Sequence, residues 1–310
     1  MTPKRPVLRW HGGKWKLAPW IITLLPPHRI YVEPFGGAAS VLLRKPRTYA
    51  EVYNDLDRGV VNLFQCLRDK EKSEQLKNEI ILTPFAREEF LHAYEESTDP
   101  VEMARRLIIR SFMGFGSNAH NPASRSGFRA NSNRSGTTPA HDWMNWPGQI
   151  DAFVERLRGV CIENRKACEV IAAHDSTETL IYADPPYPIS TRVGMKSSGS
   201  KGYLHEMTDD DHRELAKSLR DAVGMVVISG YACDLYDKEL YPDWRRIEKK
   251  AFADGARARV EIVWMNDAAA NALSWANPAM LFSNEPHHPK CENISLPALS
   301  HQNGPLMPLQ

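Results

Sequence analysis

Short apolar segments alternate with amphipathic, helix-like segments along most of this 310-residue chain. The periodicity predicts strands at residues 30–33, 48–53, 160–163, 179–183, 225–229 and 260–265. It predicts helices at residues 17–25, 38–43, 60–67 and 209–222, the last one starting at a Thr208 capping box. Strands separated by helices indicate an α/β fold with a doubly wound, mostly parallel sheet.

Composition excludes several classes of protein. The chain is 42% hydrophobic and 25% charged, with a mean hydropathy of -0.45, which excludes fibrous and wholly disordered chains. No uninterrupted apolar stretch approaches the roughly 18 residues of a membrane helix, so we expect a cytoplasmic protein without a membrane partner. Five scattered cysteines, without a Cys-x-x-Cys pair, are expected to be reduced thiols. We expect no metal site, because His287, His288 and Cys291 have no fourth partner.

The α/β pattern is interrupted once. Residues 83–154 read as an inserted, mainly helical domain that divides the α/β domain into residues 1–82 and 155–284. The tail at 285–310 has five prolines and little periodicity, so we expect it to be disordered.

Polar and glycine residues directly follow two of the expected strands. Ligands of parallel sheets bind beyond the carboxyl ends of the strands. The turn that follows the first strand would let a ligand approach its backbone closely; it consists of Glu33, Pro34, Phe35, Gly36 and Gly37. Asp55 ends the second strand, where its carboxylate could accept hydrogen bonds from ribose hydroxyls. A structural glycine corner and an N-cap are the alternatives for the two features.

The most specific motif is Asp184-Pro185-Pro186-Tyr187, which directly follows the strand at residues 179–183. The prolines fix the backbone and remove amide donors, so that carbonyl oxygens can serve as acceptors. Asp184 adds a carboxylate, and the ring of Tyr187 can stack on a flat base. Such a pocket suits an exocyclic amino group on a heteroaromatic ring. The alternative is a turn that the prolines merely stiffen.

The inserted segment is basic. Between Glu102 and Asp142 there are six arginines and no acidic residue, a pattern that suits a phosphate-binding surface. Phe112, Phe115 and Phe128 lie in the same stretch and could reach bases. The alternative is a solvated loop that lacks acids, with some of the arginines on the exposed face of a helix.

Four motifs together resemble the D12 class, or Dam-like family, of DNA adenine N6-methyltransferases. They are Leu8 to Lys14, Val32 to Ser40, Asn54-Asp55 and Tyr182 to Tyr187, and they occur in the order of that family. The resemblance implies a Rossmann-like S-adenosylmethionine-dependent methyltransferase fold, double-stranded DNA as substrate and a monomer without an obligate protein partner. The layout is most similar to phage or prophage members, and a restriction-modification role is compatible with it.

The resemblance also implies roles for individual residues. Trp10, Lys14, Asp55 and Asp184 match the cofactor contacts of the family, together with the turn from Glu33 to Gly37. The catalytic residues would be Asp184, Pro185, Pro186 and Tyr187. Asp184 and the Pro185 carbonyl would accept hydrogen bonds from the N6 amino group of a flipped adenine, while Tyr187 stacks on its ring.

The resemblance favours DNA contact by the insertion and by a second acid-free loop at residues 188–204. The candidates for DNA contact are Arg125, Arg129, Asn131, Asn133, Arg134, Arg192, Lys196 and Lys201. Ser229-Gly230-Tyr231 stands where an Asn-containing turn is frequent in the family, so we do not transfer GATC specificity. The alternatives are an N4-cytosine methyltransferase, an RNA methyltransferase and an inactive DNA-binding relative.

Overall fold

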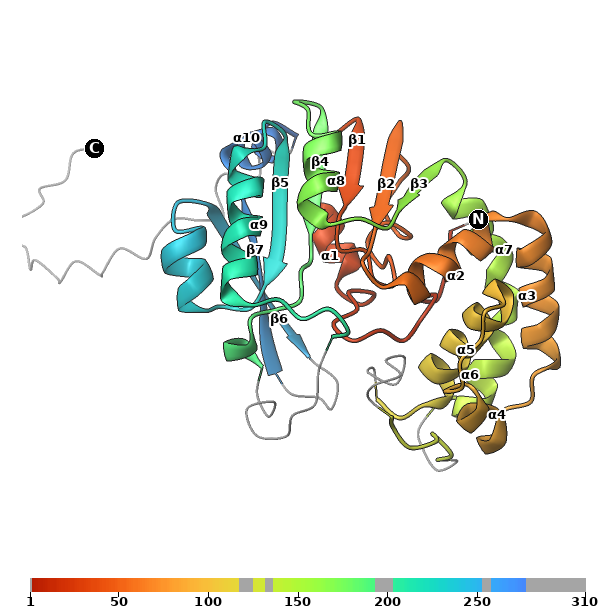
Figure 1. Ribbon diagram of the computed structural model, residues 1–310. Coiled ribbons are helices and arrows are strands. Elements are labelled where there is room, and N and C mark those ends of the chain that lie inside the picture. The colour runs from red at the N-terminus through yellow and green to blue at the C-terminus, as the bar shows by residue number, and fades with distance from the viewer. Residues whose placement is uncertain (1, 117–124, 132–135, 193–202, 253–257, 277–310) are drawn as a thin grey trace, which may run out of the picture.

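A seven-stranded sheet forms the centre of the molecule (Figure 1). The computed structural model describes residues 2–116, 125–131, 136–192, 203–252 and 258–276. The sheet order is β3-β2-β1-β4-β5-β7-β6. The first five strands in this order run parallel to one another. Strand β7 pairs antiparallel with both β5 and β6. The predicted doubly wound, mostly parallel sheet is therefore confirmed. The strands are β1 (Ile30–Glu33), β2 (Ala50–Asn54), β3 (Val160–Glu163), β4 (Thr179–Ala183), β5 (Met225–Gly230), β6 (Arg245–Phe252) and β7 (Ala258–Met265).

Helices cover both faces of the sheet, and a further set, α4 to α7, lies beside it (Figure 1). We call this set the helical group. The helices are α1 (Ala18–Thr23), α2 (Arg58–Arg68), α3 (Lys70–Leu82), α4 (Arg87–His92), α5 (Pro100–Met113), α6 (Pro139–Asn145), α7 (Ile150–Leu157), α8 (Ala167–His174), α9 (Asp209–Asp221) and α10 (Asp267–Ala276). Short 3₁₀ turns occur at Pro147–Gln149 and Ile189–Thr191, and a π-helical turn spans Leu235–Leu240. The capping box predicted at Thr208 is present at the start of α9.

The two faces of the sheet pack into different cores, because successive side chains of a strand point to opposite faces. On β4, Ile181 and Ala183 belong to a core that contains residues of α8 and α9. Leu180 and Tyr182 point the other way, into a larger core that includes α10 and the helical group. The strands are thus buried on both faces, as parallel strands normally are.

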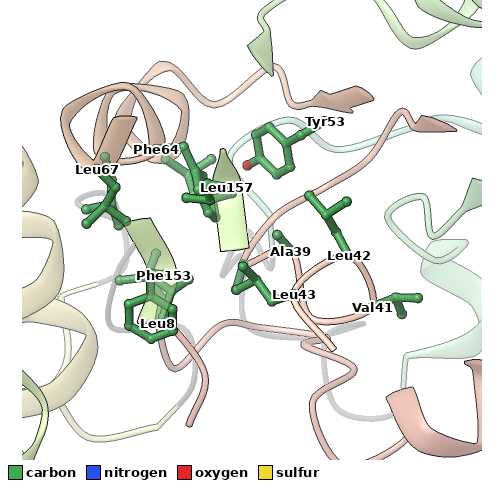
Figure 2. Close-up of a cluster of buried hydrophobic side chains, with 14 of the residues drawn as sticks. Leu8, Ala39, Val41, Leu42, Leu43, Tyr53, Phe64, Leu67, Phe153 and Leu157 are labelled. Atoms are coloured by element: carbon green, nitrogen blue, oxygen red, sulfur yellow. The ribbon is translucent and has the colours of Figure 1, made fainter. Parts of the chain in front are cut away.

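The helical group lies beside the β3 edge of the sheet (Figure 1). Helix α5 packs against α2, α3, α4 and α6, while α7 packs against α2. Figure 2 shows how α2 and α7 meet the N-terminal segment and the turn after β1. Its labelled side chains are Leu8, Ala39, Val41, Leu42, Leu43, Tyr53, Phe64, Leu67, Phe153 and Leu157. Residues before 83 therefore help to hold the inserted helices.

The helix predicted at residues 38–43 is wrong, because this segment forms a series of turns. Ala39 has φ 51°, in the left-handed region that a right-handed helix cannot contain. The Leu42 N–H donates to the Glu33 carboxylate instead of to a carbonyl four residues earlier. The buried Glu33 side chain thus replaces the helical hydrogen bond at Leu42, whereas the Leu43 N–H still donates to the Ala39 carbonyl at 2.9 Å.

Strand β6 has no counterpart among the predicted strands. Its sequence is RRIEKKAF, in which charged residues mask the alternation that indicates a strand. It forms the edge of the sheet, where charged side chains are normal and protect against unwanted pairing. The tail predicted at 285–310 lies outside the described residues. None of the described helices has the length and apolar character that crossing a membrane requires.

A buried three-residue ion network joins the turn before β2 to α7. Glu51 accepts hydrogen bonds from Lys45 Nζ at 2.6 Å and from both terminal nitrogens of Arg156, at 2.6 and 2.9 Å. The three side chains are at most 5% exposed. Removing the shared carboxylate would leave two cations buried without their partner.

We predict that Glu51→Gln lowers the free energy of unfolding by about 3–5 kcal/mol, because breaking a buried pair leaves uncompensated charge. Denaturant unfolding measures the change. The control is Asp243→Asn, which removes a carboxylate from the surface pair with Arg220 and should change stability by about 1 kcal/mol at most. Similar losses in the two variants would contradict the prediction.

Candidate active site

A cavity of about 290 Å³ opens at the carboxyl ends of β1, β2 and β4. Four separate segments supply most of its wall: residues 10–14, 33–41, 55–57 and 203–207. The rest of the wall comes from residues 166–168 at the start of α8, from Tyr182, Asp184 and Pro186 at the end of β4 and after it, and from Asp211, Glu214 and Leu215 of α9. The cavity therefore lies where ligands bind in doubly wound sheets.

The glycine turn packs too tightly for side chains at its two glycines. A Cβ at Gly36 would lie 2.1 Å from the ring of Tyr53. Gly37 has φ 47°, and a Cβ there would lie 2.6 Å from Nε1 of Trp10. Because Tyr53 also donates a hydrogen bond to the Gly37 carbonyl at 2.7 Å, the turn is held rigidly against the cavity. The predicted residues Trp10, Gly36 and Gly37 thus come together.

Asp55 lines the same cavity and is tied to the turn. Its two carboxylate oxygens accept the N–H groups of Gly37 at 2.7 Å and Asp57 at 2.8 Å. The N-cap of α2 is Asp57, whose side chain accepts from Gly59, so Asp55 does not serve as that cap. Burial raises the pKa of Asp55 to about 6, although these two backbone donors oppose the shift.

Glu33 is buried at the end of β1, beneath the glycine turn. Its Oε2 accepts hydrogen bonds from the Tyr31 hydroxyl at 2.9 Å and from the Leu42 N–H at 3.0 Å. Burial raises the pKa of Glu33 to about 8, against the effect of these two donors. Glu33 is therefore largely protonated near neutral pH and holds the turn as a structural acceptor.

Asp184 is fixed through one of its two carboxylate oxygens. Oδ1 accepts from the Ser229 hydroxyl at 2.9 Å and lies 2.9 Å from Lys14 Nζ. The Ser229 hydroxyl is in turn 3.1 Å from that of Tyr182. Among the described residues, no donor contacts Oδ2. One oxygen thus anchors the carboxylate, and the other is available to a ligand in the cavity.

Lys14 connects three parts of the site. Its Nζ donates to the Gly12 carbonyl at 2.8 Å, lies 3.6 Å from Glu261 and sits 4.7 Å from the centre of the Tyr187 ring. Burial alone would lower the pKa of Lys14, but the Asp184 and Glu261 carboxylates outweigh it and raise the pKa above its ordinary value. Lys14 therefore stays charged inside the protein.

Tyr187 is 5% exposed, and its hydroxyl donates a short hydrogen bond to Glu261. Burial, Asp184 and Glu261 raise the pKa of Tyr187 well above its ordinary value. The hydroxyl therefore remains protonated and orients the ring from the strand β7 that carries Glu261.

Arg192, which we predict to contact DNA, ties the Asp184–Tyr187 motif to the cavity wall in this structure. Its guanidinium donates to the Glu206 carboxylate at 2.7 and 2.8 Å and to the Tyr187 carbonyl. It also lies 4.8 Å from the ring of Tyr203. Because its side chain is 9% exposed and paired with Glu206, this arginine holds residues 203–206 beside the site.

The described part of the insertion presents few of the predicted DNA contacts. Arg125 is exposed, with its guanidinium 5.3 Å from the ring of Tyr94. Arg129 is 12% exposed and lies 3.7 Å from Asp142, while Asn131 is exposed. The predicted residues Asn133, Arg134, Lys196 and Lys201 lie outside the described residues.

Other members of the basic stretch have internal partners. Arg105 and Arg106 both pair with Glu102 on α5. Of the three phenylalanines, Phe112 is buried and Phe128 packs against Phe85. Phe115, which is 72% exposed, remains available to a base.

Sequence reasoning missed several residues of the site. Glu261 follows Val260 in a strand with few other charges, and a buried acid in such a strand is a signal of function that could have identified it. Residues 203–207 and 166–168 carry no motif, and only the folded chain brings them to the cavity. Ser229, noted as a departure from the family pattern, proves to hold Asp184.

The geometry is that of a doubly wound domain with a cavity at the strand ends, lined by the anchored carboxylate of Asp184. The sequence model of the D12 class N6 adenine-specific DNA methyltransferases matches residues 10–253. The chain belongs to this family, and its reaction is the transfer of a methyl group from a donor to adenine in DNA.

Curated relatives agree with this assignment. The DNA adenine methylase of Vibrio cholerae serotype O1 is 26% identical over 227 residues, covering 70% of this chain and 76% of the relative. The DNA adenine methylase of Salmonella typhi is 23% identical over 256 residues, or 80% and 87% of the two chains. The Type II methyltransferase M1.LlaDCHI of Lactococcus lactis subsp. cremoris is 26% identical over 259 residues, or 77% and 85%.

We predict that Glu33→Gln changes how stability depends on pH. The pKa of Glu33 rises from 4.5 to about 8 on folding, so between these values unfolding releases its proton and the folded state loses stability as pH rises. Glutamine keeps an acceptor for Tyr31 and Leu42 but does not titrate. Between pH 5 and 8, the wild type should lose about 1.4 kcal/mol per pH unit relative to the variant. Urea unfolding at four pH values measures this difference, and parallel curves would contradict it.

Proposed function

We propose that this enzyme transfers the methyl group of S-adenosylmethionine to N6 of an adenine that is flipped out of double-stranded DNA. The observation that carries this proposal is Asp184, which is anchored through Oδ1 while Oδ2 is left without a donor among the described residues. A free carboxylate oxygen at a cavity, next to a fixed tyrosine ring, suits an exocyclic amino group on a flat base.

The charge of the cavity supports S-adenosylmethionine as the donor. Seven carboxylate residues line it: Glu33, Asp55, Asp57, Asp184, Glu206, Asp211 and Glu214. Glu33 is largely protonated, and Asp184 and Glu206 are paired with Lys14 and Arg192. The four other acids, Asp55, Asp57, Asp211 and Glu214, have no ion-pair partner among the described residues and outnumber the remaining lysine, Lys166. S-adenosylmethionine carries a sulfonium and an ammonium group, and this acidic surface would attract both.

The residues that would hold the donor are those of the glycine turn together with Trp10 and Asp55. Asp55 already fixes the turn through Gly37, and its carboxylate can accept hydrogen bonds from ribose hydroxyls. When bound, the cofactor supplies an electrophilic methyl group. The protein then needs no covalent intermediate of its own.

The remaining task is to orient a weak nucleophile, because the N6 lone pair of adenine is delocalised into the ring. Asp184 Oδ2 and the Pro185 carbonyl would accept the two N6 hydrogens and orient the lone pair. As the N6–CH3 bond formed and the S–CH3 bond broke, the donor would leave as a neutral thioether, and N6 would release one proton to Asp184 Oδ2 or to water. Pro186 lines the cavity, and Tyr187 stacks on the base. Lys14 keeps its proton and holds the Asp184 carboxylate in place.

The helical group would serve as the DNA-recognition part. We assign residues 83–154 to it, with residues 1–82 and 155–284 as the catalytic part. Exposed Arg125, Asn131 and Phe115 support this assignment, since they lie in the chain between α5 and α6 with side chains open to solvent. Arg129, Asn133, Arg134, Lys196 and Lys201 remain candidates for the same surface.

We predict that Asp184→Asn lowers kcat about 10²–10³-fold, since it removes the charged acceptor that orients N6. The affinity for S-adenosylmethionine should change far less than kcat. The assay follows transfer of labelled methyl to unmethylated DNA, with nucleoside analysis of the product. Asp243→Asn, a surface carboxylate paired with Arg220, is the matched control and should keep wild-type kcat.

The product decides the outcome. N6-methyladenine that depends on Asp184 supports the proposal. An Asp184→Asn variant with wild-type kcat would contradict the role of this carboxylate. N4-methylcytosine, or labelling of RNA alone, would contradict the proposed substrate.

A further inference from the structure

Three side chains form a continuous row of contacts that leads away from the Asp184–Tyr187 motif. The rings of Tyr187 and Tyr231 meet edge to face, with centroids 4.7 Å apart and an interplanar angle of 75°. The guanidinium of Arg259 lies 5.3 Å from the centre of the Tyr231 ring. Tyr231 directly follows β5, and Arg259 lies on β7. The stack thus connects the site of the target base with the β6–β7 hairpin.

Strand pairing places a second cation beside Arg259. Side chains alternate along a strand, so Arg259 shares the face of Glu261, which points into the active site. Lys249 of β6 is the register partner of Glu261, and residues directly opposite share a face. Arg259 and Lys249 are therefore diagonal neighbours on the active-site face of the hairpin. Lys250 pairs with Val260 and belongs to the opposite face.

Neither cation is neutralised within the described part of the chain. Among the described residues, no carboxylate oxygen lies within 4.0 Å of the side-chain nitrogens of Lys249 or Arg259. The carboxylate of Glu261, opposite Lys249, points inward to Lys14 and Tyr187 instead. Lys249 is exposed and Arg259 is partly exposed. Arg192, by contrast, is paired with Glu206.

The position of the two cations matches a requirement of the substrate. A cavity lined by carboxylates repels the phosphates of DNA, so a nucleotide can enter only if its phosphates are held by cations at the rim. Figure 1 shows that the β6–β7 hairpin extends beyond the carboxyl end of β5, on the edge of the sheet where the parallel strands β1 and β4 also end. A base stacked on Tyr187 is joined through one sugar to its phosphates, which brings them to this side of the site.

We propose that Arg259 and Lys249 form a phosphate-binding site for the DNA strand that contains the target adenine, with Tyr231 separating the phosphates from the base. This inference rests on the proposed function, because it takes the ligand that lies against the Asp184–Tyr187 motif to be a nucleotide of DNA. Arg259 can donate to a phosphate while its guanidinium remains stacked on Tyr231. Lys249 contributes a second point charge.

The test measures DNA affinity as a function of salt for four proteins: wild type, Arg259→Gln, Lys249→Gln and the control Lys250→Gln. Each lost phosphate contact should reduce the slope of log K against log salt by about 0.9. We expect this reduction, and several-fold weaker binding at low salt, for Arg259→Gln and Lys249→Gln. Lys250→Gln should match the wild type. S-adenosylmethionine binding, measured in parallel, should be equal in all four and reports an intact fold.

Equal slopes for Arg259→Gln and Lys250→Gln would overturn the inference. The methyl-transfer assay separates it from the proposed function. If the wild type methylates adenine while its salt slope does not depend on Arg259, the phosphate site is wrong and the proposed function stands. If the slope depends on Arg259 but no N6-methyladenine forms, the phosphate site stands and the proposed function is wrong.

Discussion

The ammonium group of Lys14 is the charge on which the rest of the site depends. It is buried between Asp184 and Glu261, with its side chain 6% exposed. A buried charge is tolerated only when partners compensate for its lost hydration. The N-terminal segment, the end of β4 and the middle of β7 must therefore meet at one point. These three segments are far apart in the sequence, and the ion pairs join them in the fold.

Several features of the cavity follow from this meeting point. Lys14 and Ser229 occupy the same oxygen of Asp184, which leaves the other oxygen for substrate. Glu261 also accepts the hydrogen bond of the Tyr187 hydroxyl, so the ring proposed to stack on the base is fixed from β7. Two residues further toward the end of the hairpin, Arg259 lies on the same face of β7 and contacts the Tyr231 ring. The proposed DNA contact and the proposed chemistry would thus share one strand.

The sequence predicts the residues of this site that follow parallel strands. Glu33, Asp55 and Asp184 each come at or directly after an apolar segment, and the topology of parallel sheets brings such positions together. Strand β7 runs antiparallel, so Glu261 enters the site from within its strand and no strand-end argument could find it. Ala39 in the left-handed region and the charged edge strand β6 are decided by tertiary contacts, which local patterns do not contain. The resemblance to D12 enzymes indicated the cofactor and the base, but it did not indicate Arg259 or Tyr231.

A double-mutant cycle on Lys14 and Glu261 tests the central claim most directly. Its readout is the single-turnover rate of methyl transfer to DNA in the wild type, Lys14→Met, Glu261→Gln and the double variant. If the buried charges act as a unit, Lys14→Met leaves Glu261 uncompensated, and adding Glu261→Gln restores part of the loss. We predict a coupling energy between Lys14 and Glu261 of about 1 kcal/mol or more. Rate losses that simply multiply would contradict it, because Lys14 and Glu261 would then act independently.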